Sequence, residues 1–450
     1  MSNENPSDEV PADARRAFVG LWQGIIEAGG GRIRLVFDVR EEPGRLTAVA
    51  SSPDQVTADI PVASVVVDGE NICFDVPETH GVYEGTINRK DNSIIGKWKQ
   101  AGSSFAVDLS RIEHVVRVRR PQDPVPPFPY TTREVVITNT AAAISLSGTL
   151  TIPQGDGPFP AALLVTGSGP QNRDEEIFNH RPFLVIADYL ARRGIATLRC
   201  DDRGVGGSGG NGQIATESDL TDDAISAVDY LQSQPEIAAA RVGVIGHSEG
   251  GIIAPRVAQA RPELGFIVLL AGTGWSGHEV LLQQTAAILR AGGAPEAQIN
   301  ATVDANRSIY DAILAEPDNT RVLERLKPMM EKLGVPPDQI GPQAETVITP
   351  WFRSFLSSDP ALALTGIQCP VLAMNGAKDV QVLADLNLDA IARAVHAGGN
   401  MRVEIVKFEG LNHLFQHATT GLPQEYGQIQ ETFAPEVLEK IGDWILSQTK

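Results

Sequence analysis

One serine in the sequence stands where it could act as a nucleophile. Ser248 lies in the run Gly246-His247-Ser248-Glu249-Gly250-Gly251, between the apolar segment 242–245 and a helical stretch. In such a G-x-S-x-G turn, small residues two positions to either side of the serine allow a bend tight enough to lift the hydroxyl above a sheet. The N-terminus of the helix then lies beneath the serine and favours a developing negative charge. The pattern therefore predicts Ser248 as a catalytic nucleophile.

A serine hydroxyl needs a base to take its proton, and two downstream residues have the right order for that chemistry. In proteins with this type of turn, an acid and then a histidine follow the serine along the chain. Asp379 follows the apolar segment 371–374, and His413 follows the segment 403–406. We expect His413 to take and return the proton, and Asp379 to hold its imidazole and stabilise the charged form.

Other residues remain alternatives for the acid and the base. Asp385, Asp389 and Glu409 are the alternative acids, although the first two fall in a predicted helix, where a solvated face is the simpler interpretation. His417 and His396 are the alternative bases, and the former lies in the same loop as the favoured histidine or one helical turn beyond it.

A tetrahedral intermediate also needs hydrogen-bond donors for its oxyanion. One donor is expected to be the backbone N–H of Glu249, directly after the nucleophile. The other is expected from the glycine-rich loop 166–170, where the N–H of Ser168 is the first choice and that of Gly169 the second. The lysine of a phosphate-binding loop does not follow this loop, so we do not expect it to bind phosphate.

These residues need a scaffold, and the sequence from residue 131 onward has the pattern of one. Apolar strands alternate with amphipathic helices, which is typical of a mostly parallel, doubly wound sheet of the α/β class. The predicted strands are 133–137, 144–150, 161–165, 195–199, 242–245, 266–270, 371–374 and 403–406, and the predicted helices are 183–193, 219–232 and 435–447. We predict a catalytic domain formed by residues 131–274 and 365–450.

The segment 275–364 interrupts this alternation. It has no sequence pattern typical of strands, and helices are predicted at 280–291, 297–315 and 320–333. An insertion at this point predicts a helical cap over the carboxyl ends of the strands. Apolar cap residues are candidates for lining an acyl pocket. They are Trp275, Leu281, Leu282, Trp351, Phe352 and Phe355.

The chain before residue 131 differs in composition and in its pattern of apolar and polar residues. Residues 1–17 are polar and rich in Asn, Asp, Glu and Pro, which predicts disorder. Short alternating segments fill residues 18–113 and predict a small all-β, barrel-like domain of about eight strands, similar to a lipocalin-like half barrel. Prolines concentrated in residues 114–130 predict a stiff, extended linker.

Composition argues against several classes of function. The formal net charge of −19 disfavours nucleic acid and anionic membrane surfaces as partners. No apolar run approaches the roughly 18 residues of a membrane-spanning helix, and the start of the chain lacks the apolar core of an export signal. We expect a cytoplasmic protein or, alternatively, the mature form of a secreted or periplasmic one. The cysteines and histidines show no metal-ligand spacing, so we expect no metal and no other cofactor.

From about residue 130 to the C-terminus, the motifs resemble those of bacterial α/β-hydrolase esterases of the serine-aminopeptidase-like group. The stretches that carry the resemblance are Gly167–Asp174, Asp202–Gly204, Gly246–Gly251, Lys378–Val382 and Leu411–Gln416. The resemblance implies an α/β-hydrolase fold, carboxylester hydrolysis and a triad of Ser248, Asp379 and His413. One departure is Thr166, where such loops usually have histidine, which alters the rim of the pocket but leaves the backbone donors intact. Relatives with a similar N-terminal β domain are often exported, which keeps a secreted origin open.

The leading hypothesis is a serine carboxylesterase that hydrolyses short-to-medium acyl esters of small molecules through an acyl-enzyme, as a monomer or a homodimer. The same triad could instead serve an aminopeptidase or a thioester hydrolase. An aminopeptidase would need acidic groups to hold a free amine, for which the candidates are Glu249, Asp174, Glu175 and Glu176. As a further alternative, the N-terminal domain could bind an apolar ligand.

Overall fold

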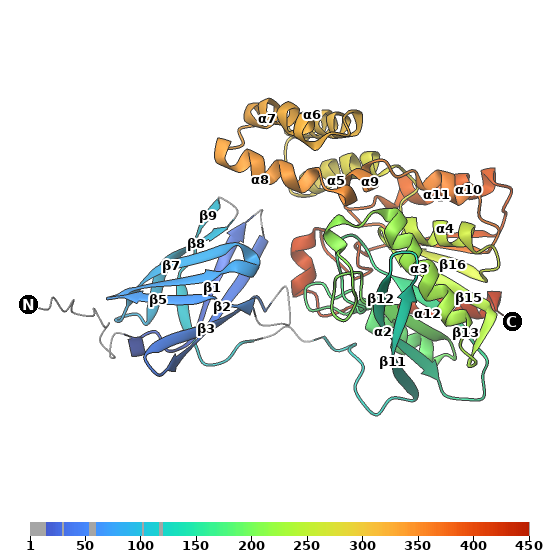
Figure 1. Cartoon of the computed structure of the whole chain (residues 1–450), viewed down its shortest axis with the longest axis horizontal. Coiled ribbons are helices and arrows are strands. Elements are labelled where there is room, and N and C mark those ends of the chain that lie inside the picture. Colours follow the sequence, from blue (N-terminus) through green and yellow to red (C-terminus); the bar gives the residue numbers. More distant parts are fainter. Residues whose placement is uncertain (1–14, 29–30, 54–59, 101–102, 117–119, 450) are drawn as a thin grey trace, which may run out of the picture. The chain divides into compact units, whose positions relative to one another are not determined.

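The computed structural model describes residues 15–28, 31–53, 60–100, 103–116 and 120–449 (Figure 1). The chain forms two compact units, of which one comprises Met1–Arg119 with Ile177–Asn179 and the other Arg120–Glu176 with His180–Lys450. Most of the segment predicted to be disordered, 1–17, lies outside the described residues. Its last three residues form part of a turn, in which the Phe18 N–H donates to the Arg15 carbonyl at 3.1 Å.

The larger unit is built around an eight-stranded sheet in the order β11-β12-β14-β13-β15-β16-β17-β18. The pairs β11–β12 and β12–β14 are antiparallel, and the other pairs are parallel. The strands are β11 (Tyr130–Asn139), β12 (Ile144–Pro153), β13 (Phe159–Val165), β14 (Ala196–Cys200), β15 (Ile237–His247), β16 (Phe266–Leu270), β17 (Val371–Gly376) and β18 (Val403–Phe408). This confirms the predicted mostly parallel, doubly wound sheet.

Helices cover both faces of this sheet, because each strand face is apolar and must be removed from water. One apolar core forms between the sheet and α3, α4 and α11, and a second forms between the sheet and α2 and α12. These helices are α2 (Pro182–Arg192), α3 (Glu217–Gln232), α4 (Gly250–Ala260), α11 (Ala384–Ala397) and α12 (Pro435–Gln448). Strand β15, which precedes the serine, is buried from Val242 to His247, so it gives the serine turn a rigid base.

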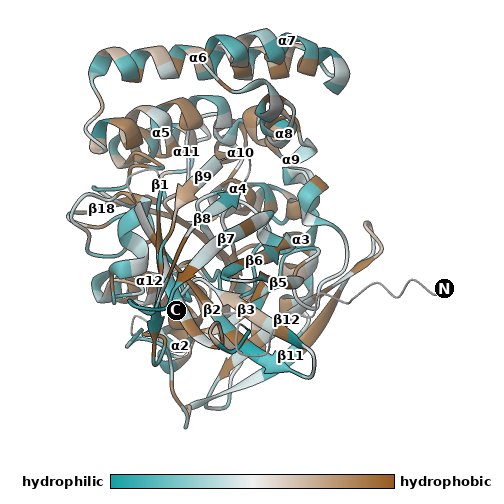
Figure 2. Cartoon of the chain, turned by 90° about the vertical axis from the view of Figure 1, so that its left-hand side faces the viewer, coloured by the Kyte–Doolittle hydropathy of each residue, from teal (hydrophilic) through white to brown (hydrophobic). Residues whose placement is uncertain are grey.

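The segment between β16 and β17 is helical, as predicted. It contains α5 (Gly277–Ala291), α6 (Glu296–Ala315), α7 (Asn319–Lys332), α8 (Pro337–Val347), α9 (Pro350–Leu356) and α10 (Pro360–Thr365). Helices α6 and α7 show both hydrophilic and hydrophobic residues (Figure 2). The hydrophobic side chains form a small separate core that includes Tyr310, Ile313, Leu326 and Leu356. The last three helices were not predicted, because they are short and each begins with proline, which suits a first helical turn but resembles a loop signal.

The second half of the predicted linker 114–130 is held against the larger unit. Arg120 donates from Nη1 to the carbonyl of Ile429 at 2.6 Å. The Gln122 side chain donates to the Phe433 carbonyl at 2.6 Å and accepts from the Thr432 N–H at 2.6 Å. The side chains of Arg120 and Gln122 therefore anchor this part of the predicted stiff, extended linker to the rest of the larger unit.

The smaller unit is an all-β antiparallel sheet, as predicted, in the order β4-β3-β2-β1-β10-β8-β7-β6-β5 with β9 paired to β8. Its strands are β1 (Gly20–Ala28), β2 (Gly31–Glu42), β3 (Arg45–Ser51), β4 (Ile60–Pro61), β5 (Ser64–Asp68), β6 (Asn71–Val76), β7 (Gly81–Asn88), β8 (Ser93–Gln100), β9 (Ser103–Ala106) and β10 (Leu109–Ile112). Val107 and Asp108 separate β9 from β10, and the carbonyl of Val107 accepts from the buried Tyr83 hydroxyl at 3.0 Å.

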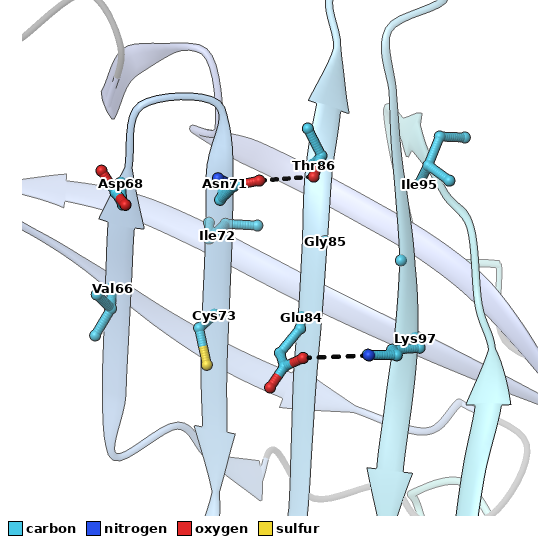
Figure 3. A pocket seen from close by; sticks show the side chains of 11 residues that line it. Val66, Asp68, Asn71, Ile72, Cys73, Glu84, Gly85, Thr86, Ile95 and Lys97 are labelled. Atoms are coloured by element: carbon cyan, nitrogen blue, oxygen red, sulfur yellow. Dashed lines mark hydrogen bonds and ion pairs between the residues drawn. The ribbon is translucent and has the colours of Figure 1, made fainter.

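Aromatic side chains fill the interior of the smaller unit. The rings of Phe37 and Phe74 stack with centroids 4.2 Å apart, and Tyr83 lies 5.9 Å from Phe74. Trp22 and Trp98 are also buried in this core. A cavity of about 560 Å³ lies instead along strands β5 to β8, lined mostly by residues that alternate with the buried ones (Figure 3). This cavity therefore lies outside the aromatic core.

Candidate active site

Ser248 lies in the sharp turn between β15 and α4. Its φ of +52° is in the left-handed region, which a residue with a side chain rarely adopts unless its surroundings hold it there. The Ser248 N–H donates to the Leu270 carbonyl at 2.8 Å, which ties the turn to the next strand. A Cβ on Gly246 would collide with the backbone of Gly250, and one on Gly250 would collide with the Val165 carbonyl. The turn therefore requires both glycines of the motif.

Asp379 and His413 are brought together at the ends of β17 and β18. The Nδ1 of His413 and Oδ2 of Asp379 are 2.7 Å apart, and both side chains are buried. The other carboxylate oxygen of Asp379 accepts the N–H groups of Gln381 and Val382 at 2.8 and 2.9 Å. The carboxylate is thus held fixed, and within the described ranges Nε2 of His413 has no recorded partner that would compete with a serine hydroxyl.

The loop predicted to hold the oxyanion lies beside the serine. A Cβ built on Gly167 would be 3.3 Å from the Cβ of Ser248. The Gly167 N–H itself donates to Glu175 Oε1 at 2.7 Å. The N–H groups of Ser168, Gly169 and Glu249 have no recorded acceptor among the residues that the structure describes. The predicted donors are therefore free to bind an oxyanion, whereas that of Gly167 is engaged.

Thr166, the departure from the family pattern, has a structural partner. Its hydroxyl donates to the Asp202 carboxylate, 2.9 Å from Oδ1, and the Gln171 N–H donates to the same carboxylate at 2.9 Å. Burial raises the pKa of Asp202 to about 7, against the lowering effect of these hydrogen bonds. Thr166 therefore ties the oxyanion loop to the loop after β14.

The alternative acids and bases lie elsewhere. Asp385 pairs with Lys407, and Asp389 pairs with an arginine one helical turn away; Glu409 is exposed. His396 is exposed near the end of α11, and His417 is exposed and pairs with Glu431 at 2.9 Å. The geometry thus favours the first-choice acid and base over all of these.

His247 and Glu175 join the loops of this site, although Glu175 was expected there only as a candidate for holding a free amine. Nδ1 of His247 is 2.8 Å from Glu175 Oε1, and Nε2 of His247 is 3.0 Å from the carbonyl of His413. Burial disfavours a charge on His247, but the neighbouring Glu175 carboxylate outweighs it and raises the pKa of His247. No local pattern predicts the contact between Glu175 and His247, although His247 lies inside the serine motif.

Glu249 connects the serine turn to the cap. Its buried carboxyl accepts the indole N–H of Trp351, which lies 3.0 Å from Oε1. Burial raises the pKa of Glu249 to about 8, and the nearby Glu217 carboxylate acts in the same direction. The Trp351 ring stacks on Phe355 with centroids 5.6 Å apart. An apolar wall therefore lies next to the residue that follows the nucleophile.

The other predicted lining residues contact different neighbours. The Phe352 ring is 5.8 Å from Tyr310 in the cap core, and the Trp275 indole N–H donates to the Leu386 carbonyl on α11 at 3.1 Å. Their contribution to substrate binding stays a prediction.

This chain is similar to known serine aminopeptidases and esterases. Residues 181–334 match the model of the serine aminopeptidase S33 family. Esterase EstD of Thermotoga maritima is 28% identical over 307 residues, which is 67% of this chain and 65% of that protein, so the chain spans just under two thirds of this relative.

Two solved structures of hydrolases are similar to this chain at lower sequence identity. A Pyrococcus furiosus esterase has a TM-score of 0.46 and 17% identity over 75% of this chain and 100% of that one. The α/β hydrolase GrgF from a Penicillium species has a TM-score of 0.45 and 16% identity over 71% and 99% of the two chains. By its sheet topology and its serine turn the chain has an α/β-hydrolase fold, and in sequence it resembles an esterase and the serine aminopeptidase S33 family.

Proposed function

We propose that this chain is a serine carboxylesterase that hydrolyses short-to-medium acyl esters of small molecules through an acyl-enzyme. His413 takes the proton of the Ser248 hydroxyl as its oxygen attacks the ester carbonyl, and then gives that proton to the leaving alcohol. The same histidine next activates a water molecule, which releases the acid and restores the serine.

The observation that carries this proposal is the buried 2.7 Å contact between His413 Nδ1 and Asp379. A proton on Nδ1 that is held by the carboxylate leaves Nε2 as the acceptor for the serine proton. The backbone of the same histidine is 3.0 Å from His247, the residue before Ser248, which supports a short path between base and nucleophile. The unengaged N–H groups of Ser168 and Glu249 support their role as oxyanion donors.

The substrate class rests on two further points. The relative from Thermotoga maritima is named an esterase, which favours an ester over an amide. The stacked rings of Trp351 and Phe355 beside Glu249 support an apolar wall for an acyl chain of limited length.

The test compares the full-length chain with its Ser248→Ala variant on p-nitrophenyl acetate, butyrate, octanoate and palmitate. We expect hydrolysis of the shorter esters by the parent, a weak reaction with palmitate, and a loss of at least about a thousandfold in the variant. A folded variant that keeps more than a few per cent of the activity would contradict the proposal.

An aminopeptidase is the second candidate, because a buried carboxyl, that of Glu249, lies beside the serine and the matched family is one of serine aminopeptidases. Two of the other acidic candidates are less suited, since Asp174 pairs with Arg199 and Glu175 with His247. With its pKa at about 8, Glu249 is mostly uncharged at neutral pH and binds an ammonium group weakly.

Amino-acid p-nitroanilides compared with p-nitrophenyl butyrate separate these functions, and acyl thioesters in the same panel test the thioester alternative. The esterase proposal predicts the highest kcat/KM for the oxygen ester. A higher kcat/KM for the anilide would favour the aminopeptidase.

A further inference from the structure

Two loops that belong to different parts of the sequence meet at one buried carboxylate, and a third loop is joined to them through a histidine ring. Oε1 of Glu175 is 2.7 Å from the N–H of Gly167 in the oxyanion loop and 2.8 Å from Nδ1 of His247 in the serine turn. The opposite nitrogen of the His247 ring is 3.0 Å from the carbonyl of His413. The chain of contacts therefore runs from the oxyanion loop, through the nucleophile turn, to the loop that holds the base.

Both members of the pair are fixed. The side chains of Glu175 and His247 are buried, where hydrogen bonds to charged groups are stronger than in water. Each ring nitrogen of His247 faces an acceptor, so the doubly protonated imidazolium satisfies both contacts. Glu175 has a φ of +52°, a left-handed conformation that the surrounding contacts must hold in place.

We propose that Glu175 and His247 are positioning residues, which hold the oxyanion donors, the nucleophile and the base in fixed positions relative to one another. This inference rests on the proposed hydrolytic function. Neither residue touches the ester. Glu175 fixes the residue before Ser168, and His247 fixes the backbone of the base itself.

The consequence for catalysis is geometric. The oxyanion donor and the base must each stay within about half an ångström of their productive positions relative to the serine. A misplacement of about 1 Å can cost about a hundredfold in rate. Without the carboxylate, the Gly167 N–H and His247 both lose their acceptor, so the oxyanion loop and the serine turn can move apart.

The test uses Glu175→Ala and Glu175→Gln in the full-length chain. The alanine removes both contacts, whereas the glutamine keeps an acceptor for the Gly167 N–H and removes only the charge. Glu431→Gln is a matched control, because Glu431 also accepts from a backbone N–H (2.8 Å) and a histidine Nδ1 (2.9 Å), both of His417, but at an exposed site. Rates are divided by the number of reactive serines, which a fluorophosphonate probe titrates.

We expect kcat per titrated serine to fall about a hundredfold in Glu175→Ala and about tenfold in Glu175→Gln, with KM changed by less than about threefold. Glu431→Gln should stay within about twofold of the parent. Because the pair acts as a unit, Glu175→Ala combined with His247→Phe should lose no more than the worse single variant.

An unchanged kcat per titrated serine in Glu175→Gln and Glu175→Ala would overturn the inference, as would losses that simply add in the double variant. If the alanine variant does not fold, the isosteric glutamine variant decides alone. A parent chain without esterase activity, or an active Ser248→Ala variant, would instead refute the proposed function.

Discussion

Ser248 adopts a left-handed backbone conformation that a serine would not choose by itself, with φ at +52°. Glycines on both sides and a hydrogen bond to Leu270 keep the serine in this strained conformation. The resulting turn exposes the hydroxyl above the sheet. The adjacent Asp379–His413 contact supplies an oriented imidazole. Among single residues, the proposed chemistry therefore depends on the direction in which the proton of the Ser248 hydroxyl can move.

Asp379→Asn tests that direction. An asparagine amide can donate to Nδ1 of His413, which would put the ring proton on Nε2 and leave no acceptor for the serine proton. We expect kcat on p-nitrophenyl butyrate to fall by about 10⁴ at pH 7.5, with an unchanged circular dichroism spectrum. Asp385→Asn, at the exposed alternative acid, should stay within about twofold. An Asp379→Asn variant with a tenth of the parent rate would refute this role.

Glu249 predicts a pH dependence of stability. Its pKa is about 8 in the folded chain against an ordinary value of 4.5, so between these pH values the folded state retains a proton that the unfolded state has lost. Its contribution to stability is full below about pH 4.5 and declines as the pH rises through 8. Glu249→Gln, which keeps an acceptor for Trp351, should raise Tm by a few degrees at pH 8 and by much less at pH 5.

Calorimetry of the two proteins across this range checks the sign, with Glu409→Gln at an exposed carboxylate as the control. A Tm difference that grows toward acid pH would contradict the buried, mostly protonated state of Glu249.

Sequence could indicate which acid and histidine lie together, because chain order and strand ends suffice for that; their catalytic roles stay predictions. The contacts of Glu175 and Glu249 could not be predicted in this way. Their partners, His247 and Trp351, are 72 and 102 positions away along the chain, and no local pattern encodes such a contact.

At the scale of elements, the site depends on how closely β13, β15 and α4 approach one another. The carbonyl of Thr166, just after β13, would lie 2.8 Å from a Cβ on Gly250, the first residue of α4. The long helices and the sheet strands were predictable because apolar residues recur along them at regular spacing. The break between β9 and β10 and the short proline-started cap helices were not, because they depend on tertiary contacts such as that of Tyr83 with Val107.

Gly250→Ala tests this close approach. The added methyl group collides with the end of β13, so we expect a loss of about 1–3 kcal/mol in the free energy of unfolding and a displaced serine turn. Gly341→Ala on α8 is the matched control, since a Cβ there meets no atom within 4 Å and alanine favours a helix. Urea unfolding followed by fluorescence measures both, and equal midpoints would contradict the tight packing.

At the scale of the whole molecule, every residue proposed for catalysis belongs to the larger unit, Arg120–Glu176 with His180–Lys450. That unit has its own apolar cores, and the cap has another. Phe37, Phe74 and Tyr83 lie in the interior of the smaller unit, and an apolar ligand on this unit stays a prediction. Across the described ranges, every helix is too short or too polar to span a bilayer.

Residues 120–450 expressed alone test this independence. Because both cores of the catalytic sheet are complete in this fragment, we expect it to fold and to hydrolyse p-nitrophenyl acetate within about tenfold of the full-length rate. A folded fragment with less than a hundredth of that rate would show that the smaller unit takes part in catalysis.

The most direct measurement is the mass of the chain during turnover and after reaction with a fluorophosphonate. We expect a single adduct that maps to Ser248, a transient acyl adduct on the same residue with p-nitrophenyl butyrate, and neither in Ser248→Ala. An adduct on another residue, or ester hydrolysis that persists in folded Ser248→Ala, would contradict the claim that Ser248 is the nucleophile.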